Sequence, residues 1–258
     1  MCRVIQCTDP ETINEIVKYN NTQNEITTWD QYSNDPDQNR IYEEFQQLGH
    51  FYSRKRGFRT RVDQVGIEEV AQPLLAFHGK VQDSNRGKNL IFERKPLYRV
   101  AFEDKKATHV LLVYALARAI DSRRIELKTK SSSGAIISME EDKLALFRSL
   151  RFKSFLIGVV ARCLETIIGR KVDAGNVAFT LDSARADQNT IYALAAVWAP
   201  VVEAVLSFIS TKINSTEFAA RSSDEELLNS VAKYVSAMLY AAKKALTFPD
   251  FISMLSDS

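Results

Sequence analysis

The chain has 258 residues, of which 45% are hydrophobic and 26% are charged. This composition provides enough apolar side chains for a folded core, so it excludes wholesale disorder. No run approaches the roughly 18 apolar residues of a membrane span, and the first residues lack the basic and apolar regions of a signal peptide. The sequence therefore predicts a soluble, cytoplasmic protein with no membrane partner.

The net charge of +2 hides an uneven distribution along the chain. Residues 1–39 carry 2 basic and 7 acidic side chains, residues 40–130 carry 19 and 11, and residues 131–258 carry 13 and 14. A basic block of this kind favours an anionic partner, such as DNA or RNA.

The first third of the chain contains a strand-like segment and two helices with clear start signals. Residues 3–7 have the composition of a strand. Asp9-Pro10 and Asp35-Pro36 each place an aspartate at an N-cap and a proline at the first helical position. Gly49 ends the second helix, and an aromatic, strand-like segment at residues 50–53 follows it.

Apolar periodicity predicts further helices in the rest of the chain. They lie at residues 67–77, around Tyr98 and at residues 107–124, with a polar loop at residues 82–88. Pro73 must kink the first of these helices or lie near its start. Residues 130–134, a lysine, three serines and a glycine, have the composition of a linker. Three long helices are predicted beyond it, at about 140–168, 190–213 and 224–246, and a short one after Pro249. We expect a mostly α protein, with an α-rich module containing a small β element at residues 1–130 and a helical bundle at 131–258.

Catalytic signatures are missing from the sequence. There is no glycine-rich phosphate loop, nucleophile elbow or zinc-protease motif, so no catalytic residue, cofactor or metal site is predicted. The three cysteines are interpreted as reduced thiols, and the three histidines as packed or surface side chains. Glu93-Arg94-Lys95 and Glu126-Leu127-Lys128 match the Glu-x-Lys triplet of magnesium-dependent nucleases, which leaves such a nuclease as one hypothesis.

One short segment is strongly basic and is flanked by Tyr52. Arginine forks bind phosphate oxygens in pairs, and an aromatic ring stacks on unpaired bases. The alternative is a solvated basic hairpin, or arginines that pair with the acidic N-terminal third. The candidate nucleic-acid-binding residues are Arg54, Lys55, Arg56, Arg59, Arg61 and Tyr52.

Five amide and hydroxyl side chains follow one another at residues 20–24. Such residues cap helix ends and tolerate tight turns, which favours a structural turn. They also form paired hydrogen bonds with bases or with a neighbouring backbone, so a binding role stays open.

These segments resemble conserved positions of the bacterial AIPR family, named for abortive infection and phage resistance. The resemblance rests on an N-T-Q-N-E-I run at residues 21–26, an aspartate, S-N-D-P-D-Q at residues 33–38, and a tyrosine-bearing run into R-K-R-G at residues 54–57. It covers about residues 4–120. The polar positions of these motifs are Asn21, Gln23, Asn24, Asp30, Asn34, Asp35 and Gln38.

The resemblance implies a bacterial defence protein. Since the upstream N-N-G and N-G-x-Q-T motifs of the family are missing, the chain is similar to the C-terminal, non-catalytic portion of such a protein. The first hypothesis is that it binds nucleic acid through the basic segment. The second is a protein-interaction module, in which the arginines pair with an acidic partner or an upstream region and the helical half forms a homo-oligomer.

Overall fold

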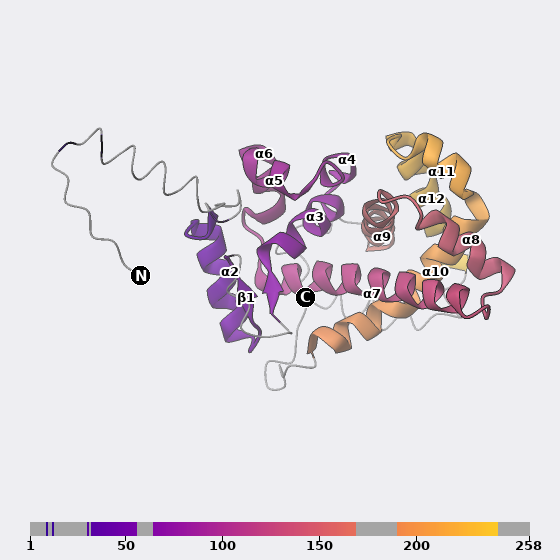
Figure 1. The fold of residues 1–258 in the computed structure, drawn as a ribbon, viewed down its shortest axis with the longest axis horizontal. Coiled ribbons are helices and arrows are strands. Elements are labelled where there is room, and N and C mark those ends of the chain that lie inside the picture. The colour runs from indigo at the N-terminus through magenta and orange to yellow at the C-terminus, as the bar shows by residue number, and fades with distance from the viewer. Residues whose placement is uncertain are drawn as a thin grey trace.

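A computed structural model describes residues 9, 12, 30, 32–55, 64–168 and 190–241. These residues form α-helices and one pair of two-residue strands, which confirms the prediction of a mostly α protein (Figure 1). No helix in this part of the chain is long and apolar enough to cross a membrane. Residues 3–7 and the segment after Pro249 lie outside the described residues.

The elements are α2 (Pro36–Gln47), β1 (Tyr52–Ser53), β2 (Val65–Gly66), α3 (Ile67–Phe77), α4 (Val81–Ser84), α5 (Lys88–Glu93), α6 (Lys95–Phe102), α7 (Ala107–Ser132), α8 (Ser138–Leu146), α9 (Phe152–Ile168), α10 (Thr190–Lys212), α11 (Ser215–Arg221) and α12 (Glu225–Ala241).

Helix α2 begins and ends at the predicted signals. Its N-cap is Asp35, whose Oδ1 accepts a hydrogen bond from the backbone N–H of Asp37 at 3.0 Å, and Pro36 occupies the first helical position. Gly49 follows the helix with φ of 72°, a conformation that costs a glycine little. The cap and the glycine together fix the length of α2.

The β element differs from a hairpin. Strands β1 and β2 are parallel, with Tyr52 opposite Val65 and Ser53 opposite Gly66. Parallel pairing requires the chain to cross over between the strands, whereas a hairpin turns back directly. The basic segment therefore begins in a crossover connection, and most of that connection lies outside the described residues.

Between β2 and α7, the chain forms a series of short helices. Helix α3 has the predicted bounds and continues through Pro73 to Phe77. The predicted loop at residues 82–88 is partly wrong, because α4 includes three of these residues and α5 begins at the last of them. Val81 and Ser84 are buried, and packing of that kind stabilises a single helical turn that local sequence does not favour.

Helix α7 is the central element, and other helices lie on several sides of it (Figure 1). Nearly every residue of its first half is buried, including Val110, Leu111, Leu112 and Val113, which face four successive directions around the helix. A helix that is apolar all round is stable only when neighbours cover all its faces. Helices α10 and α3 supply most of that cover, and α9 adds a smaller part.

The predicted linker is partly helical. Lys130 and the first two serines after it form the last turn of α7, and only Ser133 and Gly134 lie beyond its end. The hydroxyl of Ser132 donates to the carbonyl oxygen of Lys128 at 3.0 Å, an arrangement that keeps a serine in a helix. Gly134 has φ of 71° and forms the turn. The division into modules at residue 130 stays a prediction.

The predicted helix at residues 140–168 is two helices, α8 and α9, joined by a turn. Phe152 packs edge-on against Phe147 at 5.0 Å between ring centroids and against Phe218 of α11 at 5.2 Å. Edge-on aromatic pairs of this geometry are favourable. They hold the α8–α9 turn in a fixed position on the molecule.

One contiguous hydrophobic core joins helices from before and after residue 130. Leu111 of α7, Leu156 of α9, Val202 of α10 and Val231 of α12 all belong to it. Trp198 of α10 is fully buried, and its indole N–H donates to the carbonyl oxygen of Leu112 at 3.1 Å. The indole therefore packs in the core without leaving its one donor unsatisfied.

A network of ion pairs connects α7, α8 and α10. Arg123 of α7 contacts Glu203 of α10 at 2.6 Å and Glu140 of α8 at 3.3 Å, and Lys143 of α8 contacts Glu203 at 2.6 Å. Burial acts to raise the pKa of Glu203, but the hydrogen bonds from Arg123 and Lys143 lower it below its usual value of 4.5. The folded state thus favours the ionised carboxylate.

We predict that Glu203→Gln destabilises the protein at pH 7 and that this difference shrinks at pH 3. A lowered pKa stabilises the fold above 4.5, and this contribution is lost as the pH falls through the folded value. The loss at pH 7 should be about 1 kcal/mol, because Glu203 is partly exposed to solvent. Urea unfolding of the variant and the unaltered protein at both pH values measures the difference in stability. Glu225→Gln is the control, because Glu225 pairs with Arg162 at an exposed position. Equal effects of the two substitutions would contradict the prediction.

A close approach between α9 and α4 requires glycine at position 158. A Cβ atom added there would lie 2.6 Å from Cγ2 of Val81. In a helix with free space at this position, alanine is about 1 kcal/mol more stable than glycine. Here the added methyl group would press on Val81, and overpacking of that kind costs about 1–3 kcal/mol.

We predict that Gly158→Ala lowers the melting temperature by a few degrees, at about 2–4 °C per kcal/mol. The Val81→Ala, Gly158→Ala double variant should lose less than the two single variants together, because the clash is removed. Calorimetry of all four proteins tests this, and additive losses would contradict it.

Candidate anion-binding site

Two of the four polar motif positions that the structure describes, Asp35 and Gln38, belong to a hydrogen-bond network centred on the buried side chain of Gln38. Gln38 is fully buried; its Oε1 accepts from the hydroxyl of Tyr52 at 2.8 Å, and its Nε2 donates to the hydroxyl of Tyr98 at 3.2 Å. The Tyr98 hydroxyl in turn donates to Oδ1 of Asp35 at 2.8 Å. The network ties α2 to β1 and α6.

This network places Tyr52 in the core, where it is 2% exposed. Its ring packs against Phe45, with ring centroids 4.9 Å apart, and burial raises the pKa of its hydroxyl well above the ordinary value. No face of the ring is available to stack on a base. Tyr52 therefore acts in packing, and sequence reasoning missed this because the strand is too short to show alternation.

The remaining polar positions lie at the edge of the network. Asn34 is exposed, and its carbonyl oxygen accepts from Nδ2 of Asn39 at 3.2 Å. Asp30 is half-buried, and its carbonyl oxygen accepts from the backbone N–H of Ser33 at 3.2 Å. Asn21, Gln23 and Asn24 lie outside the described residues.

The basic segment is described only at its start. The guanidinium of Arg54 lies 4.4 Å from the ring centroid of Tyr42 and donates to Oδ1 of Asn39, so it is committed to α2. Lys55 is exposed. The other three residues of the segment lie outside the described residues: Arg56, Arg59 and Arg61.

The two Glu-x-Lys triplets lie on helices. Glu93 ends α5 and Lys95 begins α6, whereas Glu126 and Lys128 lie within α7. Glu126 pairs with Arg123 at 2.8 Å, and this hydrogen bond lowers the pKa of its carboxyl. Among the described residues, no three His, Cys, Asp or Glu side chains come together to hold a metal ion.

The histidines and cysteines that the structure places in the core are packed. Nε2 of His78 lies 2.8 Å from Nε2 of His109, and burial lowers the pKa of His109 well below its usual value, with His78 and Lys105 adding to the effect. Cys163 is a free, buried thiol, and burial raises its pKa to about 11. A thiol in that state is a poor nucleophile at neutral pH.

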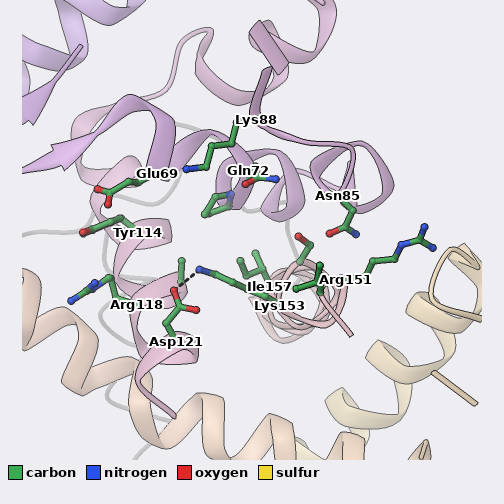
Figure 2. Close-up of a pocket in the computed structure, with 14 residues that line it drawn as sticks. Glu69, Gln72, Asn85, Lys88, Tyr114, Arg118, Asp121, Arg151, Lys153 and Ile157 are labelled. Carbon is green, nitrogen blue, oxygen red and sulfur yellow. Dashed lines mark hydrogen bonds and ion pairs between the residues drawn. The ribbon is translucent and has the colours of Figure 1, made fainter. Parts of the chain in front are cut away.

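A hollow of about 430 Å³ lies between α3, α7 and α9 (Figure 2). We call it the basic hollow, because four cations line it and only two acids do. The α4–α5 connection and the α8–α9 turn complete its rim. Its charged and amide side chains are Glu69, Gln72, Asn85, Lys88, Arg118, Asp121, Arg151 and Lys153.

Both carboxylates of the basic hollow have partners within the protein. Lys153 reaches from α9 to Asp121 of α7, with Nζ 2.5 Å from Oδ2 (Figure 2). Glu69 accepts a hydrogen bond from the backbone N–H of Gly66 at 3.1 Å, which caps the start of α3. Their negative charges are therefore partly compensated, so they oppose an anionic ligand less than isolated carboxylates would.

Three cations of the basic hollow have no such compensation. Lys88, Arg118 and Arg151 are exposed, and none of them forms an ion pair with any described residue. Arg151 only donates a hydrogen bond of 3.3 Å to the hydroxyl of Ser222. Three unpaired cations around one hollow attract an anion, and the guanidinium groups suit phosphate.

Sequence reasoning did not find this site. Its cations are residues 88 and 118 and the neighbouring pair 151 and 153, which lie in three distant parts of the chain, so no local cluster marks the site. The one signal was the excess of basic residues in the segment 40–130, to which Lys88 and Arg118 belong. Only the packing of α3 and α9 on α7 brings the four together.

The comparison with known families agrees with the motifs in the first half of the chain. A family model described as AIPR protein matches residues 1–244. The chain belongs to the AIPR family. The match confirms the resemblance at residues 4–120 and extends to the helices beyond Gly134. No curated protein and no solved structure matches the chain.

Membership of the AIPR family supports a role in abortive infection, a defence against phage. The structure adds that the Asp35 and Gln38 positions of the family motif lie in a buried network. The basic hollow shares no residue with that motif.

We predict that Gln38→Leu lowers the free energy of unfolding by about 1–3 kcal/mol, because it leaves the buried Tyr52 hydroxyl without its acceptor and removes one of the two partners of the Tyr98 hydroxyl, which keeps Asp35. Gln46→Leu is the matched control, since Gln46 also donates to a tyrosine hydroxyl, that of Tyr42 at 2.9 Å, but is exposed. The control should change stability by less than about 0.5 kcal/mol. Urea unfolding measures both, and a small effect of Gln38→Leu would argue against a structural role.

Proposed function

We propose that this AIPR chain is a non-catalytic part of a cytoplasmic antiphage protein and that it binds nucleic acid. The observation that carries the proposal is the set of three unpaired cations around the basic hollow: Lys88, Arg118 and Arg151. A phosphate backbone is the commonest cellular anion that offers several charges at short spacing.

The basic segment is a second contact in this proposal. Arg54 is held by α2, so the exposed Lys55 and the following Arg56, Arg59 and Arg61 are the groups available for phosphate. Lys88, Arg118 and the basic segment all belong to the basic block at residues 40–130, whereas Arg151 lies beyond it. Contacts of this kind give affinity without sequence preference.

A second candidate function is association with another protein or with a second copy of the chain. Ile125 of α7, Ile137 before α8 and Met139 of α8 are large apolar side chains that are exposed. Larger exposed apolar patches mark interaction surfaces. Light scattering over a range of concentrations tests this candidate, which predicts a mass that rises with concentration.

The test of nucleic-acid binding is fluorescence anisotropy with labelled single- and double-stranded DNA and RNA. We expect affinity to fall steeply between about 50 and about 200 mM salt. The Lys88→Glu, Arg118→Glu double variant should bind more weakly, with a slope against log salt that is smaller by about 0.7–0.9 per lost phosphate contact. A variant with Lys55→Glu and Arg56→Glu tests the basic segment separately, and it leaves the contacts of Arg54 with α2 in place.

The matched control is Lys106→Glu, Lys128→Glu, which makes the same change in net charge at exposed positions outside the basic hollow. It should bind nearly as the unaltered chain does. Equal losses in the two double variants would show a non-specific charge effect and contradict the site. Cleavage of the labelled strand in the presence of Mg²⁺ would contradict the non-catalytic role.

A further inference from the structure

Two of the unpaired cations of the basic hollow lie at opposite ends of it. Arg118 belongs to α7, and Arg151 comes directly before α9. Figure 2 shows their side chains pointing in opposite directions, with Lys153 between them. A single phosphate therefore contacts only one of the two arginines, whereas a ligand with several phosphates in a row contacts both.

A second hollow of about 610 Å³ lies beside the basic hollow, between the α8–α9 turn and α11. Leu150 and Arg151 line both hollows, so the two meet at this turn. Nη1 of Arg151 donates to the hydroxyl of Ser222, which lines the second hollow, at 3.3 Å. The guanidinium of Arg151 therefore lies on the side of the second hollow.

The second hollow is positively charged. Arg148 is its other charged side chain, and no acidic residue is among the described residues that line it. Arg148 is exposed and forms no ion pair with a described residue. The excess of positive charge thus continues from the basic hollow past Arg151 to Arg148. A row of positive charge is complementary to a phosphodiester backbone.

An exposed leucine stands where the two hollows meet. Leu150 is 92% exposed, and it belongs to the turn that the contact between Phe147 and Phe152 holds in place. Pro73 and Ile157 extend the apolar surface into the basic hollow. A ligand that covers Leu150 gains the free energy of removing this surface from water, and the face of an unpaired base packs against apolar side chains in this way.

We propose that the two hollows form one track for a single-stranded nucleic acid, with separate phosphates at Arg118, Arg151 and Arg148 and an unpaired base on Leu150. This inference rests on the nucleic-acid binding proposed above and specifies the form of the ligand. The strand crosses the α8–α9 turn between the basic hollow and the second hollow. Each arginine contacts its own phosphate, so the cations do not have to converge.

A duplex fits this surface less well than a single strand. Its bases are stacked and paired, so a base step would have to open before a base face could cover Leu150, and this opening costs free energy. Proteins that bind single strands combine a positively charged groove along the backbone with side chains on which unpaired bases stack. The track supplies arginines along its length and a leucine at its middle.

The experiment is fluorescence anisotropy of the full chain with a labelled single strand of about 12 nucleotides, the duplex of the same sequence and a dinucleotide, each prepared as DNA and as RNA. We expect the single strand to bind about tenfold more tightly than the duplex, because a stacked base adds to the phosphate contacts. The dinucleotide should bind more weakly than the longer strand, because it cannot reach from Arg118 to Arg148.

Arg148→Glu tests the end of the track that lies outside the basic hollow. It should weaken single-strand binding about five- to tenfold and lower the slope against log salt by about 0.7, as expected for one lost phosphate contact. The matched control is Arg94→Glu, which makes the same change at an exposed arginine that lines neither hollow. It should change the affinity by less than about twofold, because salt screens distant charges.

Leu150→Ala tests the base contact. It should weaken single-strand binding about three- to tenfold and leave duplex binding and the salt slope unchanged, because it removes apolar surface and no charge. The matched control is Ile137→Ala, at an apolar side chain that is 62% exposed and lines neither hollow. All four substituted positions are exposed, so each variant should fold as the unaltered chain does.

Three results would each overturn the track. They are duplex binding as tight as single-strand binding, a dinucleotide that binds as tightly as the longer strand, and losses in Arg148→Glu and Leu150→Ala no greater than in their controls. Nucleic-acid binding through the basic hollow would survive these results. If no labelled nucleic acid binds the unaltered chain, both the track and the nucleic-acid function are rejected.

Discussion

The burial of helix α7 is the constraint on which the rest of the structure depends. Its first half is buried on almost every side and exposes only Arg118 fully, so other helices must surround it before that surface leaves water. Helices α3, α9 and α10 cover it, and Trp198 adds a hydrogen bond to the carbonyl oxygen of Leu112. The same helices also position the charged groups of the surface. Helices α3 and α9 form walls of the basic hollow, and α10 supplies Glu203 to the ion-pair network. The position of every candidate functional group is therefore set by packing against one helix.

Polar groups inside the fold are used in pairs and networks. The Asp35, Gln38, Tyr52 and Tyr98 side chains satisfy one another where α2, β1 and α6 meet, so burial leaves none of their linking atoms without a partner. Polar residues of a family motif suggest a site when they are seen in sequence alone. In the structure, Asp35 and Gln38 instead form hydrogen bonds that fix α2 against β1 and α6.

The charges on the surface follow a different pattern. Around α8 and α10, acids and bases compensate one another, as Arg123, Lys143, Glu140 and Glu203 do. Around the basic hollow, both carboxylates have partners within the protein. Three cations, Lys88, Arg118 and Arg151, form no ion pair with a described residue. An excess of positive charge in a concave part of the surface attracts anions. This contrast within one molecule is the reason the nucleic-acid proposal is centred on the basic hollow.

The sequence by itself determined the helical class, the start of α2 at Asp35 and its stop at Gly49, and the bounds of α3. These depend on caps, glycines and apolar spacing, all of which act within a few residues. It also carried enough of the family motif to indicate the AIPR family, which the match over residues 1–244 confirms. The tertiary structure alone decided that the turn of α4 is helical, that two of the three serines after Lys130 continue α7, and that Tyr52 is buried. It alone brought Lys88, Arg118, Arg151 and Lys153 around one hollow, because residues that far apart in the chain meet only when α3 and α9 pack on α7.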